Sequence, residues 1–296
     1  MRPRPLLLLP LLLIACKGAD TIAPVSGGGG PVPLMGHVIV VVEENTDYSS
    51  VIGSSSMPYL NGLAQQYALA TKYYAVTHPS IGNYFMMTVG KIITNDDSYS
   101  GVVSDDNIIR RLIAAGKTWK SYAEDLPSVG YTGGDVGNYA RKHNVIALLS
   151  DVVNSATQRD NLVPFSQFAT DLAAGNLPDY SFIAPNLCDD AHDCSLSTAD
   201  QWLQTNIDPL VKNATFQRDG LLVITFDESS GDNVNGGGHV ATVIVSPKAK
   251  HGYEGVGVYE HQSLLRLTAQ ALGVTPPNAA ATAPDMGEFF STTGTP

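Results

Sequence analysis

The hydrophobic positions of this chain form short apolar runs, separated by segments in which apolar and polar residues recur with helical spacing. The runs lack polar alternation, so we expect strands buried on both faces. These strands are expected at residues 37–42, 68–74, 117–122, 180–184, 221–226 and 240–245. Helices are expected at residues 57–67, 81–89, 106–115, 165–174, 199–210 and 261–272. The alternation predicts an α/β fold, a three-layer αβα sandwich with a mostly parallel central sheet.

Acidic residues stand directly after two of the expected strands. The first run leads into Glu43, Glu44 and Asn45, and the run at 221–226 leads into Asp227 and Glu228. In parallel sheets, active sites lie outside the carboxyl ends of the strands. We therefore expect these side chains to meet at one edge of the sheet. Oxygen ligands of this kind suit one divalent cation, and Mg²⁺, Ca²⁺, Mn²⁺ and Zn²⁺ all remain possible. Glu43 is expected to form hydrogen bonds behind the metal ligands, and direct contact with the metal is the alternative.

A serine stands at the start of the helix expected at 81–89. Ser80 follows His78 and Pro79, at or beside the N-cap, where free backbone N–H groups favour an anion. A capping serine is the simpler interpretation. A nearby metal activates a serine hydroxyl, however, and this makes Ser80 a candidate nucleophile. Asn83 follows one turn later and is a candidate phosphate ligand.

The N-terminus carries an export signal. Two arginines and a leucine-rich block at 6–13 precede a small residue and Cys16. This pattern is typical of a lipoprotein signal peptide at residues 1–15, with Cys16 as the lipidated residue. A plain secretory signal is the alternative, and either one exports the protein. We therefore expect a lipid-anchored protein on the periplasmic or outer face of a bacterial membrane, with the lipid as its only membrane contact.

Composition fits an exported enzyme. The chain has 296 residues, of which 44% are hydrophobic and 15% charged, and its formal net charge is -11. This size suits one large catalytic domain at residues 36–275, between a flexible tether at 16–35 and a tail at 276–296. The acidity argues against nucleic acid as a partner, since polyanions are bound through positive fields.

Two further cysteines, Cys188 and Cys194, lie close together in the sequence. In an oxidising compartment we expect them to form a disulfide. A zinc site is the alternative, but it needs two more soft ligands, and only His192 is nearby.

Five segments together resemble the phosphoesterase family of bacterial acid phosphatases and phospholipase C enzymes, which belongs to the alkaline phosphatase superfamily. The resemblance covers residues 36–274, in matching order. The segments are HVIVVVEENTDYSSVI, THPSIGNYFMMTVG, PNLCDDAHDCSLSTADQWL, ITFDESSG with GGHVATVIVSP, and YEHQSLLRLTAQALG. Two departures are Phe226, where relatives often have Trp or Tyr, and Ala191, where Met is usual. The resemblance implies an alkaline-phosphatase-like fold.

The resemblance also implies roles for individual residues. Ser80 would be both a metal ligand and the nucleophile, forming a phosphoserine that water hydrolyses. Two loops would lie at the active site, with His192 and His239 as candidate general acids, and His143 is a candidate substrate-binding residue. The implied ligands of the single metal ion are Glu44, Asn45, Ser80, Asp227 and Glu228.

The expected substrate is a small phosphomonoester, hydrolysed by an acid phosphatase. A phospholipase C-type phosphodiesterase is the first alternative, although that branch usually adds C-terminal domains. A sulfatase would mature a Cys/Ser-x-Pro-x-Arg segment, which residues 78–81 lack. A non-catalytic surface lipoprotein is a further alternative, but it would be expected to have lost metal ligands.

Overall fold

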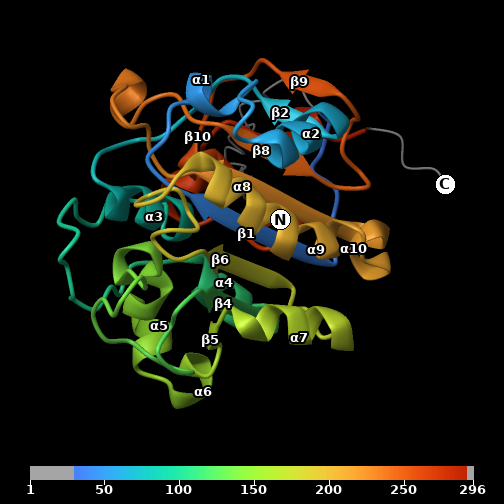
Figure 1. Ribbon diagram of the computed structural model, residues 1–296. Coiled ribbons are helices and arrows are strands. Elements are labelled where there is room, and N and C mark those ends of the chain that lie inside the picture. The colour runs from blue at the N-terminus through green and yellow to red at the C-terminus, as the bar shows by residue number, and fades with distance from the viewer. Residues whose placement is uncertain (1–29, 292–296) are drawn as a thin grey trace, which may run out of the picture.

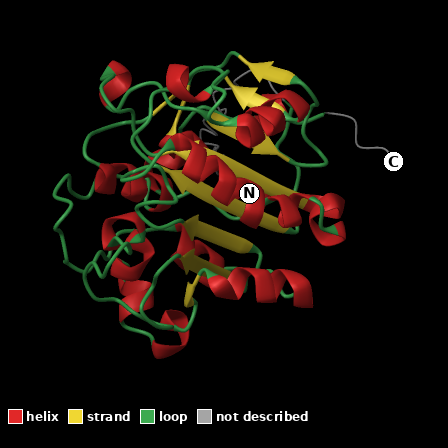
Figure 2. Cartoon of the chain, in the orientation of Figure 1, coloured by secondary structure: helices red, strands yellow, loops and turns green. Residues whose placement is uncertain are grey.

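A twisted sheet runs through the centre of the computed structural model, which describes residues 30–291 (Figures 1 and 2). Three helices, α7 (Ser166–Ala174), α8 (Leu196–Asn206) and α9 (Asp208–Val211), lie in front of this sheet in Figure 1. The predicted signal peptide, Cys16 and the tether as far as residue 29 lie outside the described residues. Within the described part, no helix is long and apolar enough to cross a membrane.

The main sheet has eight strands, in the order β5-β4-β6-β1-β7-β8-β2-β9. All neighbouring pairs from β5 to β7 are parallel, whereas β8 is antiparallel to both β7 and β2. The central strands are buried on both faces, which explains their unbroken apolar runs. The bounds are β1 (His37–Glu43), β2 (Ala68–Ala70), β4 (Trp119–Ala123), β5 (Leu162–Pro164), β6 (Tyr180–Ala184), β7 (Gly220–Phe226), β8 (Thr242–Val245) and β9 (Tyr253–Gly255).

The described residues also form eleven α-helices, several of them only one turn long. The longer ones lie close to the expected positions. The bounds are α1 (Tyr48–Val51), α2 (Pro58–Gln66), α3 (Ser80–Thr88), α4 (Ile108–Ala114), α5 (Ser150–Val153), α6 (Ala156–Arg159), α7 (Ser166–Ala174), α8 (Leu196–Asn206), α9 (Asp208–Val211), α10 (Ala214–Asp219) and α11 (His261–Ala271).

Two expected elements are divided in the structure. The strand expected at 68–74 splits into β2 and β3 (Tyr73–Tyr74), and β3 leaves the main sheet to pair with β10 (Tyr259–Glu260). The helix expected at 199–210 splits into α8 and α9, because Pro209 has no N–H to continue the hydrogen-bond ladder. The expected tail at 276–296 packs on the domain as far as residue 291, where Met286, Phe289 and Phe290 are buried.

Candidate active site

The carboxyl ends of β1 and β7 bring the predicted acidic residues together. The two strands are parallel neighbours with Glu43 opposite Phe226, so Glu44 and Asp227 leave the sheet at the same point. The backbone N–H of Asn45 donates to Oδ1 of Asp227 at 3.0 Å, and the N–H of Asp227 donates to the carbonyl of Glu43 at 2.9 Å. The strand pairing therefore fixes the relative positions of these side chains.

Ser80 reaches the same group from α3. Its hydroxyl Oγ lies 3.2 Å from Oε2 of Glu44 and 3.5 Å from Oε1 of Glu228, and the residue is 1% exposed. Ser80 is the first residue of α3, after an N-cap at Pro79, so it is not the N-cap. The side-chain amide of Asn45 donates to Oε2 of Glu44 at 3.3 Å. The structure thus brings together all five predicted metal ligands, from three separate segments.

The electrostatics of this group fit a cation. Burial, followed by the charge of Asp227, raises the pKa of Glu228 to about 8. Burial also raises the pKa of Glu44 well above its usual value, with Asp227 and Asp190 as further causes. Oδ2 of Asp227 is buried and has no hydrogen-bond partner among the described residues. A divalent ion would satisfy this oxygen and allow the carboxylates to ionise.

A second set of ligand atoms overlaps the first. One side-chain atom each from Glu44, His143 and His192 lies within 4.8 Å of the others. Both sets share Glu44. An ion bound at this edge of the sheet would therefore have oxygen ligands alone in the first set, or oxygen and histidine nitrogen ligands in the second.

His143 lies behind Glu44. Its Nε2 is 3.3 Å from Oε1 of Glu44, and its Nδ1 is 3.1 Å from Oδ2 of Asp190. The residue is only 2% exposed, and burial lowers its pKa to about 3, so the ring is neutral. This placement makes His143 a neighbour of the predicted metal ligand Glu44, and its predicted contact with substrate stays a prediction.

Tyr84 is a site residue that the sequence analysis missed. Its hydroxyl donates to Oε1 of Glu44 at 2.6 Å, and its ring stacks on His143 with centroids 5.1 Å apart. Tyr84 follows Ser80 by four positions and so lies on the same face of α3. This four-residue spacing is the feature of the sequence from which Tyr84 could have been predicted. Tyr84 therefore holds the Glu44 carboxylate, which faces Ser80 and Asn45.

We expect Tyr84→Phe to weaken binding of a divalent cation by about tenfold, because a metal ligand loses its supporting hydrogen bond. The phenyl ring keeps the stacking on His143, so the melting temperature of the metal-free protein should change little. Calorimetric titration with Mn²⁺ measures the effect. Tyr253→Phe, which loses a hydrogen bond to Glu288 instead, is the matched control. Equal Mn²⁺ affinity in both variants would remove Tyr84 from this role.

Asn83 is fully engaged with the protein. Its Oδ1 accepts hydrogen bonds from the N–H groups of Val76 and Thr77 at 3.0 and 3.3 Å. Its Nδ2 donates to the carbonyl of Thr77 at 2.8 Å and lies 3.5 Å from Oε2 of Glu228. Asn83 therefore fixes the loop that leads into Ser80, and its predicted contact with phosphate stays a prediction.

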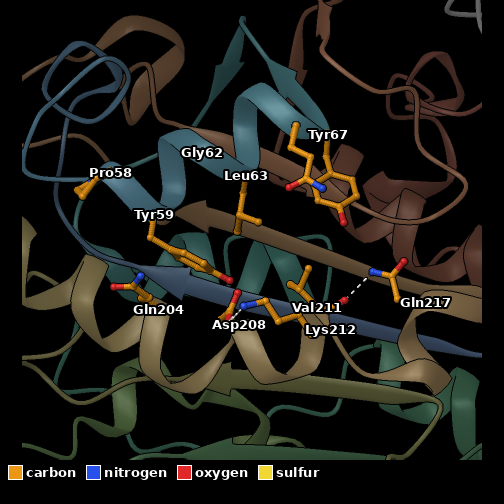
Figure 3. Close-up of a pocket in the computed structure, with 11 residues that line it drawn as sticks. Pro58, Tyr59, Gly62, Leu63, Tyr67, Gln204, Asp208, Val211, Lys212 and Gln217 are labelled. Carbon is orange, nitrogen blue, oxygen red and sulfur yellow. Dashed lines mark hydrogen bonds and ion pairs between the residues drawn. The ribbon is translucent and has the colours of Figure 1, made fainter.

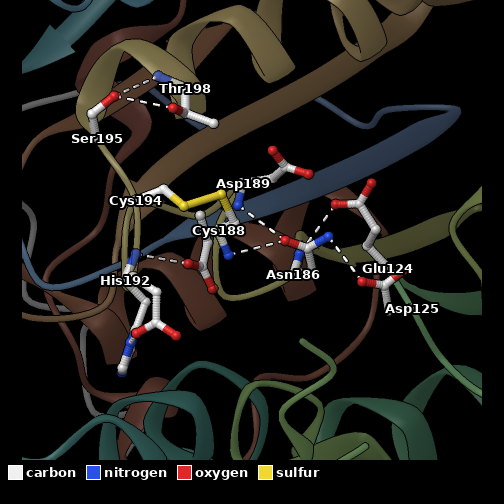
Figure 4. Close-up of a disulfide and its surroundings, with 11 residues drawn as sticks. Glu124, Asp125, Asn186, Cys188, Asp189, His192, Cys194, Ser195 and Thr198 are labelled. Atoms are coloured by element: carbon white, nitrogen blue, oxygen red, sulfur yellow. Dashed lines mark hydrogen bonds and ion pairs between the residues drawn. A yellow bond between two sulfur atoms is a disulfide. The ribbon is translucent and has the colours of Figure 1, made fainter. Parts of the chain in front are cut away.

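A disulfide joins Cys188 to Cys194, as the sequence predicted (Figure 4). It closes the loop that carries His192, whose backbone N–H donates to Oδ1 of Asp190 at 2.8 Å. Nδ1 of His192 lies 2.7 Å from Oδ1 of Asp193, and its Nε2 lies 3.3 Å from Nζ of Lys142. The loop thus places His192 at the rim of the site.

The structure does not bring the ring of His239 to this group. The ring stacks on Tyr48, with centroids 4.1 Å apart, and its Nε2 lies 3.0 Å from the carbonyl of Thr71. His78 contacts this group instead, with its Nδ1 2.8 Å from Oε2 of Glu228. The glycines at 236–238 explain the difference. They let the loop pack so closely on residues 75–77 that a Cβ at Gly236 would collide with the carbonyl of Val76.

The expectation for Glu43 was wrong. Its carboxyl group is completely buried, and neither oxygen has a hydrogen-bond partner among the described residues. Burial, with further contributions from Asp190 and Asp189, raises the pKa of Glu43 well above its usual value. Burial therefore favours the protonated form of Glu43, which lies behind the site.

A pocket of about 660 Å³ lies elsewhere, between α2 and the helices α8 to α10 (Figure 3). Its lining includes Tyr59, Leu63, Gln204 and Asp208, and it contains none of the predicted site residues. The converging carboxylates and the Ser80 hydroxyl therefore locate the chemistry better than the size of a pocket does.

Comparison with known proteins agrees with this assignment. A model of the phosphoesterase family matches residues 54–275. The chain is 31% identical over 281 residues to the phosphatidylinositol-3-phosphatase of Mycobacterium tuberculosis, covering 94% of this chain and 90% of that protein. It is 33% identical over 224 residues to a probable acid phosphatase of Kluyveromyces lactis, covering 73% of this chain and 51% of that one. The chain thus spans about half the length of this yeast relative.

Solved structures share the fold at low sequence identity. A protein of the alkaline phosphatase superfamily from Vibrio parahaemolyticus superimposes with a TM-score of 0.58 at 13% identity, covering 90% of this chain and 74% of that one. A phosphonate monoester hydrolase from Silicibacter pomeroyi also gives a TM-score of 0.58, at 12% identity, covering 86% and 76%. These matches confirm the predicted alkaline-phosphatase-like α/β fold.

Proposed function

The chain belongs to the phosphoesterase family, and we propose that it is an exported, metal-dependent acid phosphatase that hydrolyses phosphomonoesters through a phosphoserine. Family membership makes it a phosphoric ester hydrolase. The observation that carries the proposal is the position of the Ser80 hydroxyl, within 3.5 Å of two buried carboxylates at the carboxyl edge of the sheet. Export is supported by the signal pattern and by the disulfide between Cys188 and Cys194.

In this proposal Glu44, Asn45, Ser80, Asp227 and Glu228 hold one divalent cation. The fit rests on their oxygen donors and on the unpartnered, buried Oδ2 of Asp227. The bound cation would lower the pKa of the serine hydroxyl and neutralise charge on the phosphate oxygens.

The reaction has two steps. Oγ of Ser80 attacks phosphorus while the ester P–O bond breaks. The serine proton passes to a neighbouring carboxylate, and the acceptor that lies in reach is Oε2 of Glu44, 3.2 Å from Oγ. A general acid protonates the departing alkoxide, and His192 at the rim of the site is the candidate that its position favours. Water then attacks the phosphoserine, releasing inorganic phosphate and restoring the Ser80 hydroxyl.

A second candidate substrate is a phosphoinositide. The match to the phosphatidylinositol-3-phosphatase extends over 94% of this chain and 90% of that protein, which favours this candidate. A phosphate on an inositol ring is also a monoester, so the same chemistry serves both substrates.

The test compares p-nitrophenyl phosphate with bis-p-nitrophenyl phosphate between about pH 4 and pH 9, a range that spans the usual pKa of histidine. We expect the monoester to be preferred, with higher rates below neutral pH because imidazolium is the proton donor. A chelator should abolish the activity, and added divalent cation should restore it. Preference for the diester would indicate a phospholipase C-type enzyme, and no hydrolysis of either ester would indicate a binding protein. A rate unaffected by the chelator would contradict the metal.

A further inference from the structure

Lys142 places a positive charge against Asp97 and His192, at the rim of the candidate site. Its Nζ lies 3.1 Å from Oδ2 of Asp97 and 3.3 Å from Nε2 of His192, and its side chain is 16% exposed. The neighbouring Arg141 faces elsewhere, since its guanidinium donates to the carbonyls of Ser98 and Tyr99. Of these two basic residues, only Lys142 therefore contacts a residue of the candidate site, namely His192.

Asp97 connects this ammonium group to the helix that begins with Ser80. Its Oδ1 accepts a hydrogen bond from the N–H of Ile81 at 3.2 Å, while its Oδ2 faces Lys142. Lys142 is also held from a second side by the disulfide-closed loop, through His192. The short 3-10 helix Arg141–His143 supplies the third support, because His143, the next residue, contacts Glu44. Three elements thus hold the ammonium group at the site.

The surroundings keep this lysine charged. Burial lowers its pKa, but the carboxylates of Glu44 and Asp97 act against this, and the net effect is a raised pKa. The chain carries a formal net charge of -11, which repels a phosphate dianion at long range. A local ammonium group is a suitable counter-charge, since lysine acts as a mobile point charge toward phosphate.

We propose that Lys142 binds a non-bridging oxygen of the phosphoryl group and thereby favours dianionic monoesters over monoanionic diesters. This inference rests on the proposed phosphatase function and names the residue that sets its substrate class. An ammonium group can only donate, so Nε2 of His192 accepts from Lys142, and Nδ1 donates to Asp193. When Lys142 turns to the phosphate, the lone pair on Nε2 of His192 is released and takes up a proton from solvent, which His192 then donates to the leaving alkoxide.

The test measures kcat/KM for both p-nitrophenyl esters in Lys142→Met and Lys142→Arg. We expect Lys142→Met to lose about 10- to 100-fold on the monoester, the value of one charge-assisted hydrogen bond, and only a few-fold on the diester. The ratio of monoester to diester activity should therefore fall by about tenfold, and Lys142→Arg should recover part of it. Lys212→Met, an exposed lysine paired with Asp208, is the control and should leave the ratio unchanged.

Titration with inorganic phosphate separates this inference from the proposed function. Lys142→Met should bind phosphate about tenfold more weakly than the wild-type protein, with the same content of divalent metal. Equal losses on both esters, or unchanged phosphate affinity, would overturn the role of Lys142 while leaving the phosphatase intact. If the wild-type protein hydrolysed neither ester, the proposed function would fail, and the phosphate titration would still decide whether Lys142 binds the anion.

Discussion

Replacing Ser80 with alanine should lower the rate of monoester hydrolysis by about 10⁴-fold or more, the order seen when a nucleophile is removed. The hydroxyl is the candidate atom for attack on phosphorus, and its Oγ lies within 3.5 Å of Glu44 and Glu228. The rate of p-nitrophenyl phosphate hydrolysis under saturating metal measures the effect. The wild-type protein quenched in acid during turnover should yield a phosphoserine peptide containing residue 80, and the variant should not.

Ser246→Ala is the matched control. Its hydroxyl is also buried, but it donates to the carbonyl of Gly220, at the opposite end of β7. The loss of this hydrogen bond should cost about 1 kcal/mol in the free energy of unfolding and leave the rate unchanged. A Ser80→Ala protein that kept a tenth or more of the wild-type rate would exclude Ser80 as the nucleophile.

Asp227→Asn should abolish metal binding while preserving the fold. Oδ1 of Asp227 accepts hydrogen bonds from the N–H groups of Asn45 and Glu228, and an asparagine oxygen can accept both. The unpartnered Oδ2 is replaced by an NH2 group, which can only donate and cannot bind a cation. We expect activity to fall by about 10³-fold or more, and the rise in melting temperature on adding Mn²⁺ to disappear.

The effect of metal on stability should depend on pH. The pKa of Glu228 is about 8 in the folded protein, against an ordinary value of 4.5 for a glutamate in water. Between these values the folded state holds a proton that the unfolded state has released, so the stability of the metal-free protein falls as pH rises through this window. The melting temperature in chelator should be higher at about pH 5 than at about pH 8, and Mn²⁺ should raise it more at about pH 8.

Asp200→Asn is the control for Asp227→Asn. Asp200 is also buried, and its carboxylate accepts hydrogen bonds from the N–H groups of Tyr59 and Leu60. This variant should be less stable but should keep its full response to Mn²⁺. An Asp227→Asn protein that still gained stability from Mn²⁺, or a metal-free protein that became more stable toward about pH 8, would argue against the site.

Sequence patterns were sufficient to predict the centre of the fold and the convergence of the acidic residues that we propose as metal ligands. The apolar runs of β1 and β7 require burial on both faces, and strands of this kind are neighbours in a parallel sheet. Their carboxyl ends then meet, so Glu44 and Asp227 were predictable as a pair. The position of Ser80 followed from the apolar helix that begins there.

Side chains whose placement depends on loops were not predictable in the same way. No periodicity constrains the glycine-rich segment at 236–238, and its close packing turns His239 away from the site while Glu228 contacts His78. Lys142 belongs to a short 3-10 helix in a long irregular region, so its contact with His192 has no sequence signal. β3 and β10 lie far apart in the sequence, so their pairing could not be predicted. This pairing divides the strand expected at 68–74.

Anomalous diffraction from crystals grown with Mn²⁺ tests the central claim most directly. We predict one strong peak per chain, about 2.0 to 2.6 Å from oxygens of Glu44, Asn45, Ser80, Asp227 and Glu228. A peak coordinated by Glu44, His143 and His192 instead, or no peak at this edge of the sheet, would contradict it.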